Sequence, residues 1–415
     1  SFNRPNLFYD IRPKSDSFGE LLALLRSPQY KDRATIIYCF SRKDTEALAA
    51  KLRAQHLVAE AYHAGLEAQE RHAIQDRFIR DETPIITATI AFGMGIDKSD
   101  IRLVVHYALP QSIEGYYQET GRAGRDGLPA GCVMFYSYAD KFKQEYFIAK
   151  IEDDTERRHA SEKLNRMVAF CESFLCRRKF LLEYFGETYE QYNCACCDRC
   201  VSSGETFDAS VIGRAVLDCV RALGGRFGGQ YIIDILRGSR SARVRTFGHE
   251  RLPMYGQGRD FSPAQLREII NRLLEKGLLA KADGEYPTIG LSPAGRDCLA
   301  GDERLLLPQL RPTATAAGGG AHRPAARTRH AAAHDDELFQ TLRQLRKRLA
   351  DQRGVPPFII FADTSLHDMA NRLPQDDRAF LAITGVGEQK LKQYGSIFMT
   401  TIGDYLREHP RTSTA

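Results

Sequence analysis

Short runs of apolar residues alternate with longer amphipathic stretches through the first 150 residues. The run from Thr35 to Phe40 is apolar at nearly every position, which is typical of a buried strand. Similar apolar runs cover residues 58–62, 84–89, 101–107 and 132–138, and helical periodicity is found near 43–53 and 67–80. Because helices separate consecutive strands, the connections are right-handed crossovers, and this region is predicted to be a parallel α/β sheet.

The pattern changes several times after residue 150. It is helical over 153–185, ends in a cluster of cysteines, and becomes a compact helix-rich module with a late strand pair over 208–299. Residues 307–334 contain Ala, Gly and Thr, four Arg and little that can pack, which predicts a flexible basic linker. A last helical domain is predicted to run from residue 335 to about 409. The fold class is therefore multidomain, α/β followed by α.

Composition adds a few limits. A chain of 415 residues with 43% hydrophobic content is expected to hold three or four globular domains. No apolar run approaches the roughly 18 residues of a membrane span, so no membrane partner is expected. The chain begins at Ser1 without a signal or transit peptide, and we expect a fragment or trimmed protein. Five of the ten cysteines fall between Cys176 and Cys200, which favours a metal site in a reducing cytoplasm over disulfides.

Two glycine-containing segments in the first domain carry candidate chemistry. The first, at 87–98, includes Gly95 and Asp97, although a glycine pair after a strand usually marks only a turn. In the second, at 117–127, Gln118 precedes Arg122 by four residues, and Arg125 follows three later. Guanidinium groups in this arrangement suit a phosphate-facing edge, where they stabilise charge during phosphoryl transfer. The alternative interpretation is an arginine-rich, solvated loop.

The cysteine cluster predicts a structural zinc site. Cys194, Cys197 and Cys200 are spaced two residues apart, and Cys176 lies eighteen residues upstream on a predicted helix. Tetrahedral Zn²⁺ takes four sulfur or nitrogen ligands, and this set supplies four thiolates. Cys196 is a competing neighbour of Cys197. The alternatives are buried structural thiols or a redox pair.

The segment 237–259 is strongly basic. It contains six arginines and Glu250 as its one acid, with aromatic residues and glycines interleaved. This bias fits neutralisation of DNA phosphates, although a run of charge is often only a solvated face. The favoured contact residues are Arg240, Arg243, Arg245, His249 and Arg259. Near the C-terminus, Gly385-Val386-Gly387 before Lys390 and Lys392 predicts either a phosphate-binding helix start or an ordinary turn.

Together these segments resemble the RecQ family of DNA helicases over nearly the whole chain. Residues 36–42, 87–98 and 117–127 are similar to motifs IV, V and VI of superfamily 2 helicases. The sequences "AFGMGIDK" and "YYQETGRAGRDGLPAG" are similar to those of RecQ proteins in particular. "ILRGS" and "FGHERLPMYGQGRD" resemble the RecQ winged helix, and "VPPFIIFADTSLHDMA" and "AITGVGEQKLKQYG" resemble the HRDC domain.

The resemblance implies a domain order and roles for single residues. The domains are a second RecA-like lobe (1–150), a zinc-binding helical subdomain (151–205), a winged helix (206–306), the linker (307–334) and an HRDC domain (335–415). Arg125 becomes the arginine finger, Arg122 its phosphate-contacting companion and Gln118 a residue lining the ATP cleft. Gly95 contacts the nucleotide, and Asp97 contacts the nucleotide ribose or the lobe interface. The zinc ligands become Cys176, Cys194, Cys197 and Cys200, with Cys196 a bystander.

The implied activity is ATP-dependent 3′–5′ unwinding of DNA in repair and recombination. ATP and Mg²⁺ are the cofactors of the complete enzyme, and Zn²⁺ is structural. The implied partners are single-stranded, forked or duplex DNA and a single-stranded-DNA-binding protein, in the bacterial cytoplasm at the nucleoid.

One departure from the family is large. No Gly-Lys dipeptide of a phosphate-binding loop and no Asp-Glu-x-His box occurs in the sequence. We therefore expect the chain to lack the first lobe and to be no ATPase alone. Two rivals remain, a non-catalytic zinc and winged-helix DNA-binding protein and an RNA helicase of the same superfamily. The second does not bring the cysteine cluster or the HRDC-like end.

Overall fold

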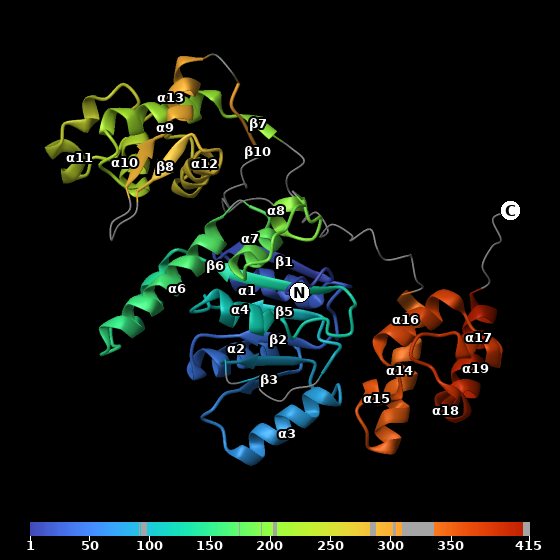
Figure 1. Cartoon of the computed structure of the whole chain (residues 1–415). Helices are drawn as coiled ribbons and strands as arrows, with labels where there is room; N and C mark the ends of the chain where they lie inside the picture. The colour runs from blue at the N-terminus through green and yellow to red at the C-terminus, as the bar shows by residue number, and fades with distance from the viewer. Residues whose placement is uncertain are drawn as a thin grey trace.

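The computed structural model describes most of the chain in three separately packed domains. The described residues are 1–90, 92, 98–173, 175–191, 193–201, 206–282, 288–301, 304–308 and 336–409. Gly95 and Asp97, the tip of the expected hairpin and nearly all of the expected linker lie outside these ranges. Figure 1 shows the first domain with its sheet, the helical central domain and the C-terminal helical domain.

A six-stranded parallel sheet forms the first domain, as the alternating pattern predicts. Its strand order is β1-β6-β5-β2-β4-β3. In that order the strands are Leu7–Pro13, Ala130–Tyr136, Leu103–His106, Thr35–Tyr38, Ile85–Ala88 and Ala59–Tyr62. β1 and the following helix α1 (Ser17–Arg26) were not predicted. β1 alternates buried and half-buried residues because it lies at the sheet edge, so it lacks the continuous apolar run of a central strand.

Helices cover both faces of this sheet. Successive residues of a strand point to opposite faces, so Ile36 belongs to one core and Ile37 to the other. The core containing Ile37 is closed by α1 and α2 (Arg42–Ala54). The core containing Ile36 is closed by α3 (Ala68–Ile79), α4 (Ile113–Thr120) and α6 (Asp154–Glu172). The carboxyl ends of all six strands consequently meet at one edge and the amino ends at the other. The connection from β5 through α4 to β6 crosses from the carboxyl edge to the amino edge, and it contains the 117–127 segment.

The cysteine-rich segment and the central domain follow the first sheet. Helices α5 (Ala139–Ile148), α6, α7 (Arg177–Tyr184) and the short α8 (Asp198–Val201) lead to the central domain. The elements of the central domain are β7 (Thr206–Asp208), α9 (Ser210–Leu223), α10 (Gly229–Leu236), α11 (Ala242–Thr246), a 3₁₀ turn (His249–Arg251), α12 (Pro263–Glu275), β8 (Leu279–Lys281), β9 (Ile289–Leu291), α13 (Pro293–Ala300) and β10 (Leu306–Pro308). β8 and β9 pair antiparallel, which is the predicted late strand pair, and β7 pairs with β10, which was not predicted.

The C-terminal domain is entirely helical within its described residues. It contains α14 (Asp336–Arg353), α15 (Pro357–Ile360), α16 (Asp363–Arg372), α17 (Asp377–Leu381), α18 (Glu388–Lys390), a π-helical turn (Leu391–Gly395) and α19 (Ser396–Glu408). At its centre the fully buried Arg346 pairs with Asp363 at 2.8 Å and donates to the Phe361 carbonyl at 2.7 Å. Arg346 thereby ties α14 to α16 and to the C-terminal end of α15.

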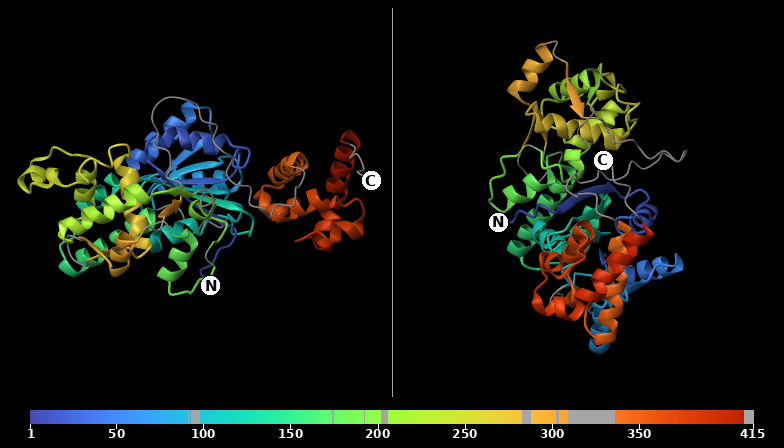
Figure 2. Two further views of the ribbon diagram at one scale, coloured as in Figure 1. Left: turned by 90° about the horizontal axis from the view of Figure 1, so that it is seen from above. Right: turned by 90° about the vertical axis from the view of Figure 1, so that its right-hand side faces the viewer.

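Helix α14 also contacts the first domain (Figure 2). Lys347 donates to the Asp81 carbonyl at 2.6 Å and Arg343 to the Asp32 carbonyl at 2.8 Å. Both aspartates have left-handed backbones, with φ of 58° and 57°, so their carbonyls lie on tight turns. Arg33 lies over the Phe339 ring at 4.6 Å, and its burial beside Arg343 lowers the pKa of the guanidinium to about 10. The C-terminal domain is therefore held against the first domain mainly by cations on backbone carbonyls.

Candidate functional site

The two arginines of the 117–127 segment follow helix α4 at the amino edge of the sheet. There the segment leads into β6, and the Gly124 amide donates to the Ile101 carbonyl, just before β5, at 2.9 Å. The helix begins behind Ser112, whose hydroxyl accepts from the Gly115 amide at 3.1 Å. Gln118 is exposed on α4, Arg122 is half-buried in the following turn, and Arg125 is exposed. The structure thus keeps all three predicted residues on one short segment and leaves Gln118 and Arg125 accessible to solvent.

Residues near the N-terminus hold this arginine loop in shape. The Arg4 guanidinium donates to the carbonyls of Gly121, Ala123 and Gly124 at 3.2, 2.8 and 2.9 Å. The Asn6 amide donates to the Gly124 carbonyl at 2.8 Å. Such side-chain donors fix the carbonyls of a loop that has no regular backbone ladder. Sequence reasoning missed Arg4 and Asn6, because nothing local to either residue marks it as a partner of a loop more than a hundred positions away.

A buried ion pair holds the far end of the same loop. Arg102 pairs with Asp126, and both side chains are less than a tenth exposed. Asp126 also accepts from the Leu128 amide at 3.1 Å. Burial raises the pKa of Asp126, and Arg102 opposes that rise. The loop is therefore anchored at both ends, which limits how far Arg122 and Arg125 can move.

The arginine loop lies close to the side chain of Tyr38 on β2. Burial raises the pKa of Tyr38 on that strand, while the positive charges of Arg122 and Arg125 oppose the rise. The Tyr38 ring stacks on His106 at 5.3 Å, and the His106 ring contacts the Glu119 carboxylate at 2.6 Å. Strands β2 and β5 and helix α4 therefore share one polar cluster beside the two arginines.

Lys98, at the end of the first glycine segment, has a structural role. Its side chain is 1% exposed, with its ammonium 2.5 Å from Asp81 and 3.1 Å from Asp100. Burial alone lowers the pKa of Lys98, but the two carboxylates outweigh it, so the net shift is upward. Asp81 is also the residue whose carbonyl receives Lys347 from the C-terminal domain. This anchor therefore links the C-terminal domain to the segment that contains Gly95 and Asp97.

The four cysteines predicted to bind metal come together. The Sγ atoms of Cys176, Cys194, Cys197 and Cys200 all lie within 4.8 Å of one another. A tetrahedral zinc with Zn–S bonds of about 2.3 Å separates its sulfurs by roughly 3.8 Å, which this set can reach. Backbone amides donate to two of the sulfurs, Cys194 to Cys200 and Cys196 to Cys194, both at 3.3 Å. Donors of this kind stabilise thiolate charge, so the residues fit a metal.

Cys196 lies outside the sulfur cluster, in agreement with its prediction as a bystander, whereas Cys176 differs from its predicted place on a helix. Cys196 is absent from the sulfur cluster, and its carbonyl accepts from the Tyr9 amide at 3.3 Å. Cys197 forms a bridge to the same residue of β1, so the cysteine turn docks on the edge of the sheet. Cys176 was expected on a helix but is the N-cap of α7. Its sulfur is thereby placed at the start of α7, facing the cysteine turn.

Arg177 and Arg178 directly follow Cys176 and form a short basic run with Lys179. On charge alone, such a run suggests a DNA contact. Arg177 is fully buried and pairs with Asp198 at 2.9 Å. Arg178 is 4% exposed and donates to the Leu7 carbonyl at 3.0 Å and to Asn3 at 2.7 Å. Both arginines clamp the cysteine segment to the first domain, so their side chains do not offer a DNA contact.

The basic segment of the central domain is largely exposed. Arg240, Arg243, Arg245 and Arg259 are all exposed, and His249 is half-buried. The Arg243 guanidinium lies 5.0 Å from the Tyr231 ring centre and 5.7 Å from that of Phe227. These rings form one cluster with Phe247 and His249, whose ring nitrogen contacts the Tyr231 hydroxyl at 2.8 Å. Burial lowers the pKa of His249, and nearby Arg226 adds to the shift.

Arg259 is less available than its neighbours. A Cβ added to Gly238 or Gly256 would meet the Arg259 guanidinium at 2.7 and 2.9 Å respectively. The Arg259 side chain therefore packs across two glycine backbones. The structure brings Arg243 and His249 to one aromatic cluster and holds Arg259 on the adjoining loop.

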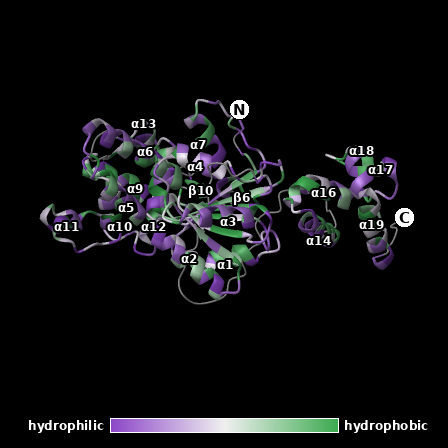
Figure 3. Cartoon of the chain, turned by 90° about the horizontal axis from the view of Figure 1, so that it is seen from below, coloured by the Kyte–Doolittle hydropathy of each residue, from purple (hydrophilic) through white to green (hydrophobic). Residues whose placement is uncertain are grey.

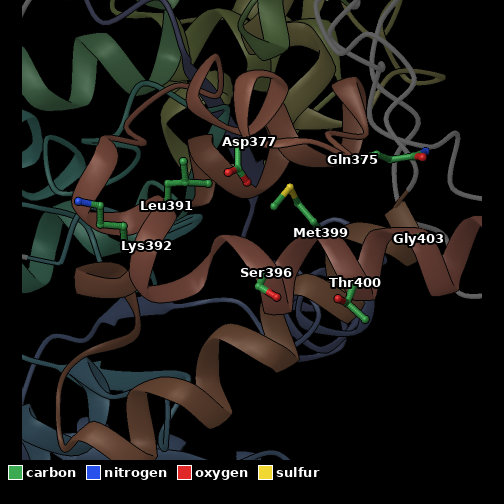
Figure 4. A pocket seen from close by; sticks show the side chains of 8 residues that line it. All are labelled: Gln375, Asp377, Leu391, Lys392, Ser396, Met399, Thr400 and Gly403. Atoms are coloured by element: carbon green, nitrogen blue, oxygen red, sulfur yellow. The ribbon is translucent and has the colours of Figure 1, made fainter.

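The glycine turn of the C-terminal domain has the geometry of a helix–helix connection. Gly385 has φ of 77°, and the helix after Gly387 is only three residues long. The Lys390 ammonium lies 5.2 Å from the centre of the Phe361 ring, and burial lowers its pKa. Lys392 lines an open hollow of about 670 Å³ with Asp377, Ser396 and neighbouring residues (Figure 4). This geometry favours the ordinary-turn interpretation over a phosphate site.

Comparison with known proteins divides the chain into four matched regions. The helicase conserved C-terminal domain matches residues 16–127, the RecQ zinc-binding domain 138–201, the RQC domain 203–315 and the HRDC domain 335–402. The ATP-dependent DNA helicase RecQ of Haemophilus influenzae is 38% identical over 98% of this chain and 64% of its own length. The protein of that name from Bacillus subtilis is 36% identical over 98% of this chain and 66% of its own length. The chain thus spans just under two thirds of these relatives.

Two glycines in the arginine loop offer a matched test of its anchoring. Gly124 has φ of 53°, and an added Cβ would meet the Asn6 amide at 2.5 Å and the Leu128 carbonyl at 2.7 Å. Gly127 has φ of 83° with open space around it. Gly127→Ala should cost about 1 kcal/mol of unfolding free energy from backbone strain alone. Gly124→Ala should cost about 3 kcal/mol, because overpacking adds to that strain.

Urea-dependent hydrogen exchange of β6 peptides measures both free energies. Equal losses for the two variants would contradict the anchoring by Asn6.

Proposed function

The chain belongs to the RecQ family, and from this membership and the site geometry we propose that it serves an ATP-driven DNA helicase moving 3′ to 5′. The observation that carries the proposal is the anchored arginine loop, with Arg122 and Arg125 at the amino edge of a RecA-like sheet. Two anchored guanidinium groups suit a triphosphate held by a facing lobe. In this proposal the chain supplies the arginine-finger lobe, the zinc site and the DNA-binding domains.

The residues present in this chain indicate which roles it has and which belong to a partner lobe. Arg125 is exposed and reaches toward the γ-phosphate, while the half-buried Arg122 contacts the phosphates beside it. Gln118 lines the cleft from α4, and Gly95 and Asp97 contact the nucleotide. The phosphate-binding loop, the Mg²⁺ ligands and the water-orienting carboxylate belong to the partner lobe, since the 415 residues contain neither motif.

The metal in this proposal is a structural zinc held by Cys176, Cys194, Cys197 and Cys200. When bound, it supplies a rigid link and no chemistry of hydrolysis. The chain's own residues extend that link, because the cysteine turn pairs with β1, and Arg177 and Arg178 bind carbonyls around it. Zinc therefore fixes the connection between the motor sheet and the central domain.

The central domain binds the duplex at a fork in this proposal. Its exposed arginines at 240, 243, 245 and 259, with His249, contact phosphates, and the adjacent strand pair β8–β9 acts as the wing. Forked or single-stranded DNA is the partner, with repair and recombination as the setting. A single-stranded-DNA-binding protein and the bacterial nucleoid complete the proposal by family resemblance alone. Within the described residues, no helix is both long and apolar enough to cross a membrane.

The competing candidate is a DNA-binding protein that has lost its motor. Such a protein would need the cysteine site and the arginines of the central domain but not the anchored arginine loop. Four separate groups, those of Arg4, Asn6, Arg102 and Asp126, maintain that loop. Anchoring of this one loop by four side chains favours a functional helicase lobe over a protein that only binds DNA.

Zinc content tests the metal assignment. One zinc per chain is expected, and Cys197→Ser should abolish it and unfold residues joining the sheet to the central domain. Structural zinc contributes roughly 10–16 kcal/mol of apparent binding free energy in small domains, so losing one ligand is severe. Elemental analysis with limited proteolysis measures both effects. Cys196→Ser is the matched control and should keep the metal, so zinc loss in that variant would refute the ligand set.

Salt dependence tests the DNA contacts of the central domain. Reversing the charge of Arg243 and Arg245 to Glu should weaken binding to many sequences alike. It should also reduce the slope of log affinity against log salt by about 0.9 per lost phosphate contact. Fluorescence anisotropy with forked DNA measures both. Arg26→Glu, at an exposed arginine of α1, is the control and should leave the slope unchanged.

ATP turnover tests the arginine finger. The 415-residue chain should bind DNA without hydrolysing ATP. In a protein that also carries the phosphate-binding lobe, Arg125→Ala should leave ATP binding intact and slow turnover by a factor on the order of 10³. DNA-stimulated hydrolysis by the 415-residue chain itself would contradict the split motor. Normal turnover in the Arg125→Ala protein would transfer the finger role to Arg122.

A further inference from the structure

Helix α5 exposes an unusual row of aromatic side chains. Tyr138, at its N-cap, and Phe142, Tyr146 and Phe147 are 39%, 60%, 60% and 48% exposed. The opposite face of the helix is buried through Asp140, Gln144 and Ile148. We call the four exposed rings the aromatic face of α5. Monomeric proteins seldom leave a contiguous apolar surface of this kind without a partner.

The rings of the aromatic face contact one another and a neighbouring loop. Tyr138 and Phe142 pack edge to face at 5.7 Å, and Tyr146 and Phe147 do so at 5.5 Å. Phe40, which follows β2 and is itself 37% exposed, lies 5.4 Å from Phe147. Five rings from two segments therefore form one surface. All are aromatic, and no aliphatic side chain larger than alanine is exposed on α5.

Cations are interleaved with these rings. The Lys150 ammonium lies 4.2 Å from the centre of the Tyr146 ring, and Lys141 lies 5.8 Å from that of Tyr138. Lys143 is 64% exposed, and its ammonium is 3.9 Å from the buried Asp140, which also binds Lys14 at 3.1 Å. Glu145 is the one exposed acid of the helix, and it pairs with Lys141 at 3.2 Å. Flat rings alternating with lysines are typical of surfaces that bind single-stranded nucleic acid.

The position of the aromatic face agrees with that chemistry. A hollow of about 230 Å³ lies beside it at the carboxyl edge of the sheet, lined by Lys14, Phe40, Lys51, Lys143 and Tyr107 among others. In parallel sheets this edge is where ligands bind. On its other side, Arg267 of α12 lies 5.3 Å from the Tyr138 ring, so α5 adjoins the central domain (Figure 3). The face thus connects the DNA-binding domain to the edge of the motor sheet.

We propose that the aromatic face of α5 binds unpaired nucleobases of single-stranded DNA by stacking, with Lys143 and Lys150 neutralising the adjacent phosphates. The proposal rests on the proposed function and adds the surface by which the motor sheet receives the strand leaving the fork. A protein partner fits less well, because lysine is depleted from protein–protein interfaces and three lysines border this face. A second copy of the chain would place these lysines against their own counterparts.

Comparing a normal strand with one that lacks bases tests the proposal in the 415-residue chain. The probes are a labelled oligothymidylate and an abasic strand with the same number of phosphates. Phe142→Ala with Tyr146→Ala should weaken oligothymidylate binding by about tenfold for each stacked base that is lost. The same double variant should bind the abasic strand as the wild type does. Its salt slope should not change, because no phosphate contact is removed.

Three variants serve as controls. Phe142→Leu with Tyr146→Leu keeps apolar area but removes the π face, and it should lose affinity as the alanine pair does. Val211→Ala changes an 83% exposed apolar residue on α9 and should have no effect. Lys143→Ala should instead reduce the slope of log affinity against log salt by the amount that one phosphate contact contributes. This reduction should be the same for the oligothymidylate and the abasic strand. Because the mutated side chains are exposed, zinc content and thermal unfolding should match the wild type.

The outcomes separate this proposal from the proposed function. Failure of the wild-type chain to bind DNA would overturn both. If Arg243→Glu with Arg245→Glu weakens binding while the aromatic variants bind normally, only the aromatic face is refuted. Equal losses on normal and abasic strands would also refute stacking. If the alanine pair instead shifts the chain from dimer to monomer with unchanged DNA affinity, the face is a self-association surface and the proposal is wrong.

Discussion

The parallel arrangement of the six strands is the constraint on which the functional geometry depends. Parallel strands send every carboxyl end to the same edge, so loops distant in sequence converge there. Tyr38 at the end of β2 and His106 at the end of β5 meet at that edge for this reason, and β6 and β1 add Ser137, Asp140 and Lys14 to it. The amino ends meet at the opposite edge, where the arginine loop precedes β6 and bonds to residues just before β5 and β1. An antiparallel sheet of equal size would mix the two sets of loops at both edges.

Arginine has two separate roles in this chain, and burial distinguishes them. Arg4, Arg102, Arg177, Arg178 and Arg346 are half-buried or buried and bind carbonyls or carboxylates within the protein. The planar guanidinium with its five donors can satisfy several such acceptors at once, which lysine cannot. The arginines at 125, 240, 243 and 245 are exposed, and in the proposed function they contact phosphates. Local charge density alone therefore misassigns residues such as Arg177 and Arg178.

The sequence predicts single secondary-structure elements and local motifs better than the long-range contacts between them. The central strands and the four clustered cysteines are recognisable because apolar runs and short cysteine spacing are local signals. β1 and α1 escaped prediction since an edge strand buries only alternate residues. Arg4 and Asn6 act on a loop more than a hundred residues away, and Lys347 acts on a carbonyl 266 residues away. Contacts of this kind depend on the tertiary fold, which no window of sequence contains.

A single segment joins the two activities attributed to the sheet. Residues Tyr107, Ala108 and Leu109 line the hollow beside the aromatic face, and Gln144 of α5 donates to the Leu109 carbonyl at 2.6 Å. Helix α4 begins four residues later, at Ile113, and ends at the turn that contains Arg122. His106 and Glu119, in contact at 2.6 Å, close this segment on itself. A strand of DNA on α5 and a triphosphate at the arginine loop would therefore act on opposite ends of one short, internally bonded unit. In the proposed function, this unit would couple the phosphate end to the DNA end without a chain of intermediate contacts.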